Sequence, residues 1–246
     1  MTAKFIEEQY RQAYRVTDVK SLNRLYRLRD ESYPVAWDTE TSSLHMGTPN
    51  VLMENGVVVS EQLYPVVFGI SIAFIIASKH MEMLVTDGVM DENCTGLCML
   101  WTRRSSSLFR TVCRVLKDQQ DKVWHNAKFD LKVCELNGIE VGGRQDCTLT
   151  MSRILNDRRR SHGLKKIVEY LCPQLSQWND PVERELTRLK NKYTRMITKK
   201  ELEWYPNIDF ANYSFVDEEI MAEYAADDSF HCLMAWLVMS GKATWR

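Results

Sequence analysis

The sequence predicts a single α/β domain, in which helices flank a mixed β-sheet. Short apolar runs of strand length come first and then alternate with segments of helical periodicity, and the order ends in helices. This alternation is typical of a sheet covered by helices. No linker-like stretch or internal repeat marks a second domain. We therefore expect residues 1–32 to form an N-terminal helical segment packed on one globular domain, residues 33–246.

The first third of the chain predicts a helix followed by several strands. Apolar positions at helical spacing within residues 3–30 predict the helix, and Pro34 ends it. Gly, Pro and Asn residues within 45–63 indicate a loop or hairpin excursion. The strands predicted in this part are residues 35–38, 66–76 and 81–85.

The rest of the chain is predicted to be mainly helical, with a short strand at residues 122–125. Leu108, Val112 and Leu116 share one face of the first helix, and Gly138 follows the end of the second. The helices predicted from this periodicity are residues 98–118, 127–136, 147–156, 163–171, 182–200 and 217–238.

Composition limits the classes of function that are open to the chain. With 32 basic and 33 acidic residues, its net charge is −1, so any polyanion would have to be bound by local basic patches and metals. The densest basic stretch is residues 158–166. We find no apolar run long enough for a signal peptide or a membrane span. Seven cysteines without an export signal predict reduced thiols and a cytoplasmic location.

Asp38 and Glu40 are the first candidate site residues. They follow a predicted buried strand, and residues two apart in a strand point to the same face. Two adjacent carboxylates repel each other unless cations neutralise them, which favours hard divalent ions such as Mg²⁺ or Mn²⁺ over zinc. The pattern is short, however, and it recurs at Asp217 and Glu219, so its context has to identify it.

Two later segments supply that context. One is residues 125–130, His-Asn-Ala-Lys-Phe-Asp, where a strand is predicted to lead into a helix. The other contains Tyr224 and Asp228, which are four residues apart and therefore share a face of the last predicted helix. Tyrosine and aspartate occur at this spacing five times in the chain, so the order and setting of the pair distinguish it.

Taken in order, these three segments resemble the three motifs of the DEDD 3′–5′ exonucleases. More narrowly, they resemble the tyrosine branch found in the proofreading domain of family A DNA polymerases. The histidine branch would place a histidine at position 223, where this chain has Glu223. The resemblance spans about residues 33–237, and residues 45–63 and 190–210 look like insertions. It implies a ribonuclease H-like fold with a mixed five-stranded sheet.

The resemblance also implies roles for the motif residues. Two divalent ions, Mg²⁺ or Mn²⁺, would bind a phosphodiester between them. Asp38, Glu40 and Asp228 would hold the first ion. Asp38 would bridge to the second, which Asp130 supports, and Tyr224 would orient the attacking water. The expected products are 5′-mononucleotides released from a 3′ end.

The resemblance also implies contacts with the substrate. Thr41 would lie near the terminal nucleotide, Leu44 would wedge against its base, and Asn126 would help to hold the strand. Trp178 could offer a stacking face, and residues 158–166 could contact phosphates. We expect Asp227 to be a solvated neighbour of the site rather than a metal ligand.

We therefore expect a metal-dependent exonuclease that acts on single-stranded or frayed DNA 3′ ends. The sequence ends shortly after Asp228, so the polymerase portion of family A enzymes is expected to be absent. This favours a stand-alone end-trimming nuclease, or a proofreading nuclease whose partner is a separately encoded polymerase, as in a bacteriophage system within the host cytoplasm. Two alternatives stay open: RNA 3′-end trimming of the ribonuclease D type, and a non-catalytic module that binds DNA or a polymerase.

Overall fold

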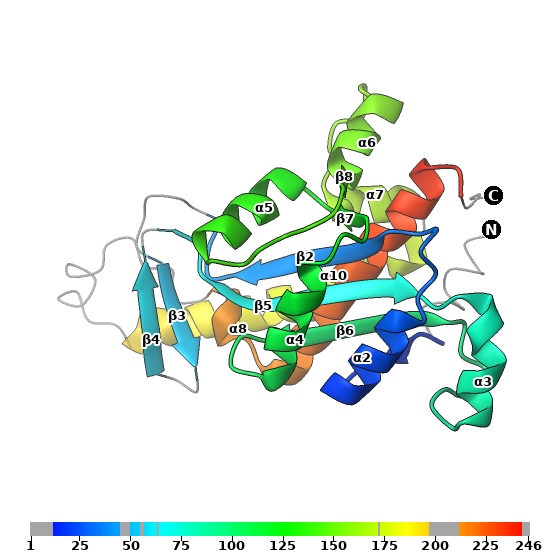
Figure 1. Cartoon of the computed structure of the whole chain (residues 1–246). Helices are drawn as coiled ribbons and strands as arrows, with labels where there is room; N and C mark the ends of the chain where they lie inside the picture. Colours follow the sequence, from blue (N-terminus) through cyan, green and yellow to red (C-terminus); the bar gives the residue numbers. More distant parts are fainter. Residues whose placement is uncertain are drawn as a thin grey trace.

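A six-stranded mixed sheet forms the centre of the protein, with strand order β1-β6-β5-β2-β7-β8 (Figure 1). The computed structural model describes residues 12–44, 50–54, 57–62, 64–171, 173–196 and 212–242. The strands of this sheet are β1 (Tyr14–Arg15), β2 (Val35–Thr41), β5 (Val67–Ile75), β6 (Leu97–Arg103), β7 (Lys122–Trp124) and β8 (Gln145–Cys147). The predicted α/β class is confirmed, and the sheet has one strand more than the five that we expected.

Helices cover both faces of this sheet. Those that are used below are α2 (Val19–Arg27), α3 (Met81–Thr86), α4 (Ser107–Leu116), α5 (Ala127–Leu136), α6 (Thr148–Leu155), α7 (Leu164–Leu171), α8 (Asp180–Met196) and α10 (Glu218–Met239). Within the described ranges, the short 3₁₀ helices are η1 (Ser78–His80), η2 (Pro173–Leu175) and η3 (Tyr213–Phe215). None of the described helices is long and apolar enough to cross a membrane.

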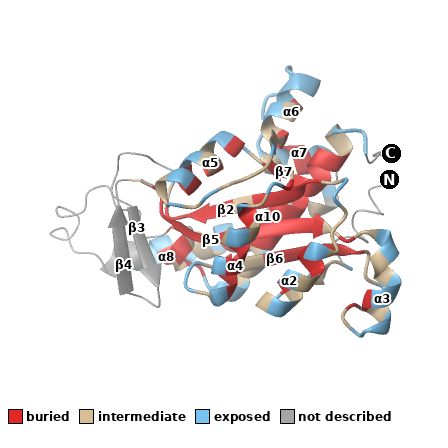
Figure 2. Ribbon diagram, viewed as in Figure 1, coloured by how far each residue is buried: buried red, intermediate tan, exposed pale blue. Residues whose placement is uncertain are grey.

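Alternation along β2 divides the core into two layers. Trp37 is fully buried on one face, in the cluster that includes residues of α2, α4 and α5. Ala36 is buried on the other face, in a cluster with Phe230 and Leu233 of α10. Figure 2 shows the buried residues concentrated in the sheet and in α10. A helix that is buried nearly all round is expected to be apolar on every side, so acids within α10 call for a specific explanation.

The end of β2 extends beyond its parallel neighbour. β2 pairs antiparallel with β5 along its length, from Ala36 opposite Ala73 to Thr41 opposite Val67. Its parallel pairing with β7 covers only Val35 and Ala36. The strand residues that follow therefore leave one edge of β2 available to side chains from α5.

The predicted N-terminal helix is shorter than the sequence indicated. Of the described residues, Tyr14 and Arg15 form β1, parallel to β6, and α2 begins only at Val19. The start is fixed by Asp18, whose carboxylate accepts hydrogen bonds from the backbone N–H groups of Lys20 and Ser21. Residues 1–11 lie outside the described residues.

The strand predicted at residues 81–85 is wrong, because these residues form α3. Leu84 is the only fully buried side chain of this helix, and Met83 is 42% exposed. A strand would instead have buried alternate residues on one face. The short apolar run thus packs one side of a single helical turn against the core.

The helix predicted at residues 98–118 is also wrong in its first part. Residues 97–103 form β6, and α4 begins after Ser106, whose hydroxyl accepts a hydrogen bond from the N–H of Leu108. A short apolar run is compatible with either a buried strand or a buried helix, and length has to separate them. Here β6 lies inside the sheet, between β1 and β5.

The remaining elements agree with the prediction to different degrees. β8 was not predicted, whereas the loop or hairpin predicted within 45–63 contains a hairpin of β3 (Asn50–Glu54) and β4 (Val57–Gln62). α8 ends at Met196, so the end of the predicted helix 182–200 and most of the predicted insertion 190–210 lie outside the described residues.

Candidate active site

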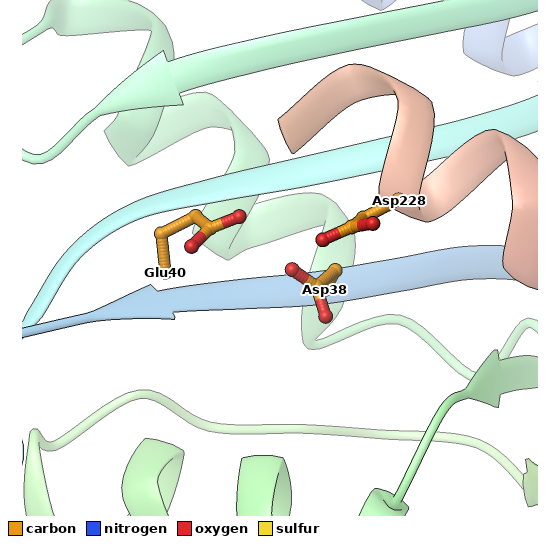
Figure 3. A group of neighbouring side chains, drawn as sticks. All are labelled: Asp38, Glu40 and Asp228. Atoms are coloured by element: carbon orange, nitrogen blue, oxygen red, sulfur yellow. The ribbon is translucent and has the colours of Figure 1, made fainter. Parts of the chain in front are cut away.

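Three of the predicted acids converge between β2 and α10. Asp38 and Glu40 project from the same face of β2, and Asp228 approaches them from α10 (Figure 3). One carboxylate oxygen from each lies within 4.8 Å of the others. The alternation of the strand produces this arrangement, because Ala36, two residues earlier, faces the same helix.

The acids raise one another's pKa. Burial raises the pKa of Asp38 well above its usual value, and the negative charges of Glu40, Asp130 and Asp228 raise it further. Burial and the charge of Asp228 do the same for Glu40. In the metal-free protein, therefore, full ionisation of the cluster is unfavourable.

This cluster fits a divalent metal ion. Glu40 is 5% exposed, and its buried Oε1 has no hydrogen-bond partner, so a strong acceptor points into the site without a donor. The ligand set consists of carboxylate oxygens, which suit Mg²⁺ or Mn²⁺ rather than zinc. A bound cation would satisfy this oxygen and neutralise the mutual repulsion.

Asp130 lies beside the cluster and is held from the edge of β2. It is 3% exposed, near the start of α5. Its Oδ1 accepts hydrogen bonds from Thr39 Oγ1 at 2.6 Å and from the Thr39 backbone N at 3.3 Å. Burial raises its pKa to about 7 despite these hydrogen bonds. Asp130 is not among the three acids within 4.8 Å of one another, so it is not part of the ligand group predicted for the first ion.

Tyr224 lies one helical turn before Asp228, as predicted. Its ring stacks on Tyr213 of η3, with centroids 5.6 Å apart and planes 14° apart. Burial and the charge of Asp228 raise the pKa of Tyr224 well above its usual value. The phenol is therefore neutral at physiological pH and can donate a hydrogen bond, but it is unsuited to act as a base.

Two aromatic residues contact residues of the site in ways that the sequence did not predict, and Trp178 was expected only to offer a stacking face. Trp178 precedes α8, and its Nε1 donates a hydrogen bond of 2.6 Å to Oδ1 of Asp228. Tyr213 stacks on Tyr224, and burial together with the charge of Glu40 raises its pKa to about 12. Neither residue lies in the three motifs. Tyr213 begins one of the five tyrosine–aspartate spacings, which was the only available signal.

Asp227 is a correction to the sequence analysis. We expected a solvated neighbour, but Asp227 is 4% exposed and lies 3.3 Å from Nη2 of Arg15. The backbone of a helix turns about 100° per residue, so Asp227 faces away from Asp228 and towards the N-terminal strand. It anchors α10 to β1.

The predicted substrate contacts lie around the end of β2 and the start of α5. Thr41 is buried, and its hydroxyl donates to the backbone oxygen of Ser43. Leu44 is 71% exposed, as an apolar wedge would need to be. Asn126 is exposed and adopts a left-handed conformation, with φ of 65°, just before α5. The structure thus places these residues on adjacent segments, and their roles stay predictions.

The basic stretch connects α6 to α7. Arg158 and Arg160 are exposed, whereas Arg159 lies over the ring of Tyr170, 4.5 Å from its centroid. His162 is hydrogen-bonded to Ser152 of α6 at 2.9 Å. The stretch is therefore partly tied to its own helices, and its contact with phosphates stays a prediction.

The mixed sheet and the cluster of three carboxylates fit the class of nucleases that cleave phosphodiesters with carboxylate-bound metal. A family model described as 3′–5′ exonuclease matches residues 102–233, more than half of the chain. The chain belongs to this family, within the DEDD superfamily, and is a 3′–5′ exonuclease enzyme. The matched residues include Asp130, Tyr224 and Asp228. A comparison with curated protein sequences gives no match.

Several solved structures resemble the chain at low identity. NrnC of Brucella melitensis bound to pGG is 18% identical, with a TM-score of 0.49 over 93% of this chain and 79% of the other. The same protein with bound Mg²⁺ is 17% identical, with a TM-score of 0.47 over 93% and 80%. The ribonuclease D–GMP complex of Trypanosoma brucei is 13% identical, with a TM-score of 0.49 over 96% of this chain and 59% of the other.

Proposed function

We propose that the protein removes nucleotides one at a time from the 3′ end of a single-stranded nucleic acid, in a reaction that depends on divalent metal. The observation that carries this proposal is the convergence of Asp38, Glu40 and Asp228 within 4.8 Å, in a chain of the 3′–5′ exonuclease family. Buried carboxylates that raise one another's pKa have no evident structural purpose, and they argue against a non-catalytic binding module.

We assign the binding of one divalent ion to these three acids. Asp38 and Asp130 would hold a second ion, Asp130 with Thr39 fixing its orientation. Bound Mg²⁺ or Mn²⁺ would supply a hydroxide at neutral pH and stabilise the charge that develops on the leaving oxygen. Tyr224 would donate its phenolic hydrogen to orient the attacking water. This role supports our proposal that the protein belongs to the tyrosine branch of the superfamily.

The substrate is proposed as a single-stranded or frayed 3′ end. Two readings follow from the sequence: RNA trimming and DNA proofreading. The similar solved structures above are those of NrnC and of a ribonuclease D, so RNA is the substrate to test first. The DNA reading rests on the motif-one continuation from Thr41 to Leu44, and it would add a separately encoded polymerase as partner.

A matched pair of oligonucleotides tests this proposal. RNA and DNA of the same sequence, labelled at the 5′ end, would be incubated with Mg²⁺, Mn²⁺ or EDTA. We expect a ladder that shortens from the 3′ end, disappears in EDTA and is lost in Asp38→Asn. The oligonucleotide that is shortened faster shows whether the enzyme prefers RNA or DNA. Intact oligonucleotides in both metals, or a ladder that survives Asp38→Asn, would overturn the proposal.

A further inference from the structure

Trp178 connects the metal site to a second aromatic stack. It lies in the turn between η2 and α8, and its Nε1 is 2.6 Å from Oδ1 of Asp228. The indole ring packs against His231, with centroids 4.2 Å apart and planes 23° apart. His231 in turn bonds through Nδ1 to the backbone oxygen of Asp227 at 2.6 Å. The orientation of the indole is thus fixed by the helix that carries Asp228.

We propose that Trp178 is a positioning residue for the metal site, because its indole N–H holds the Asp228 carboxylate in the orientation that faces Asp38 and Glu40. This inference rests on the proposed metal-dependent function. A carboxylate can rotate about its side-chain torsion, and its terminal torsion is broad. An aspartate without a donor would sample orientations that turn its oxygens away from the other two acids.

The hydrogen bond suits this role for two reasons. It joins a donor to a charged acceptor, which makes it shorter and stronger than a neutral hydrogen bond. An indole N–H is also a donor only, so it can occupy one acceptor site of the carboxylate and leaves the remaining acceptor sites of the carboxylate for a cation. Donors that orient a metal ligand in this way typically contribute 10- to 100-fold to metal affinity or activity.

Trp178→Phe tests the inference, because phenylalanine keeps an aromatic ring next to His231 and removes the indole N–H together with one of the two fused rings. Trp236→Phe is a matched control from α10 itself: Trp236 Nε1 donates to Oδ2 of Asp146 at 3.0 Å, outside the acid cluster. Both changes remove one indole hydrogen bond to an aspartate. Only the first removes a donor to a proposed metal ligand.

Binding of Mn²⁺ would be measured by titration calorimetry on the whole chain without nucleic acid. We expect Trp178→Phe to bind Mn²⁺ roughly 10- to 100-fold more weakly, and Trp236→Phe to bind it within about twofold of the unmodified protein. Thermal unfolding in EDTA would establish that both variants fold. Unchanged Mn²⁺ affinity in folded Trp178→Phe would overturn the inference.

Two further measurements keep the inference separate from the proposed function and from misfolding. If the unmodified protein binds Mn²⁺ no better than Asp38→Asn, the metal site itself fails. If Trp178→Phe does not fold, a second experiment takes its place. The indole N–H resonances in the NMR spectrum of the unmodified protein would be compared with those of Asp228→Asn. We expect Asp228→Asn to shift the indole N–H resonance of Trp178 strongly. The resonance of Trp236, which is identified by its loss in Trp236→Phe, should not move. An Asp228→Asn spectrum with no shifted indole would overturn the inference.

Discussion

The Oγ1 atom of Thr39 donates a hydrogen bond of 2.6 Å to Asp130, which joins the middle residue of the first motif to the acid of the second. Asp38 and Glu40 point to one face of β2. Thr39, which lies between them, points to the other face and can therefore bind Asp130. One strand thereby organises all four acids. Two of them are its own, one packs across its face and one packs along its edge.

Thr39→Val is expected to weaken both folding and catalysis. It removes a hydroxyl donor to a buried carboxylate while keeping a β-branched residue in the strand, and an unsatisfied buried acceptor costs about 1–3 kcal/mol. We expect the free energy of unfolding to fall by that amount in a urea titration and the rate to fall about 10-fold or more. Thr102→Val is the control, because the hydroxyl of Thr102 bonds a neutral backbone oxygen at 3.3 Å. Its rate should be unchanged, and an equal loss of rate in both variants would contradict the role of Thr39.

The metal-free protein is expected to lose stability as the pH rises from 6 to 8. Asp130 and Asp228 have pKa values of about 7 in the folded protein, against 3.8 as the ordinary value. Between those values the folded state binds more protons than the unfolded state, so its stability falls as pH increases through 7. Thermal unfolding in EDTA should therefore give a lower Tm at pH 8, by about 2–4 °C for each kcal/mol lost.

Mg²⁺ should oppose this loss, because a cation binds the deprotonated carboxylates. The increase in Tm on adding Mg²⁺ should be larger at pH 8 than at pH 6. Asp228→Asn should reduce the pH dependence in EDTA, since it removes one of the titrating groups, and it should abolish most of the response to Mg²⁺. A Tm that responds equally to Mg²⁺ at both pH values would contradict the assignment.

Tyr224→Phe separates the phenolic hydrogen from the aromatic stack. The variant keeps the ring on Tyr213 but loses the donor that we assign to the attacking water, so the fold should persist while kcat falls about 10- to 100-fold. Tyr213→Phe keeps the same stack and should lower kcat less than about tenfold. Single-turnover rates with the preferred oligonucleotide would compare the two. A larger effect at Tyr213 would assign the water-orienting role to that residue instead.

Gly69→Ala should destabilise the protein through packing alone. Gly69 pairs with Glu40 across β2 and β5, and an added Cβ would lie 1.8 Å from the ring of Trp101. The ring would have to move, which breaks its hydrogen bond to Glu218 at the start of α10. We expect a loss of about 1–3 kcal/mol in urea unfolding. Gly163→Ala is the control, since its Cβ would meet only Ser161 Oγ at 3.8 Å, and it should change stability by less than about 0.5 kcal/mol.

The sequence predicted the acids better than the scaffold around them. Asp38, Glu40 and Asp228 could be grouped because strand alternation and helical spacing are local rules, and the order of the motifs supplied the long-range link. Residues 97–103 could not be separated from α4 by local rules, because a short apolar run suits a buried strand or a buried helix. The site residue Trp178 was beyond such rules too, since its contact with Asp228 spans 50 residues.

The pairing of Arg15 with Asp227 joins residues 212 positions apart, and α10 is the last described helix. Contacts between distant parts of a chain form late, because loop closure has to precede them. During synthesis, Asp38 and Glu40 leave the ribosome well before Asp228, which follows them much later in the sequence. The cluster of three acids is therefore complete only when α10 has packed against β2, and the same helix carries the Asp227 that pairs with Arg15 of β1.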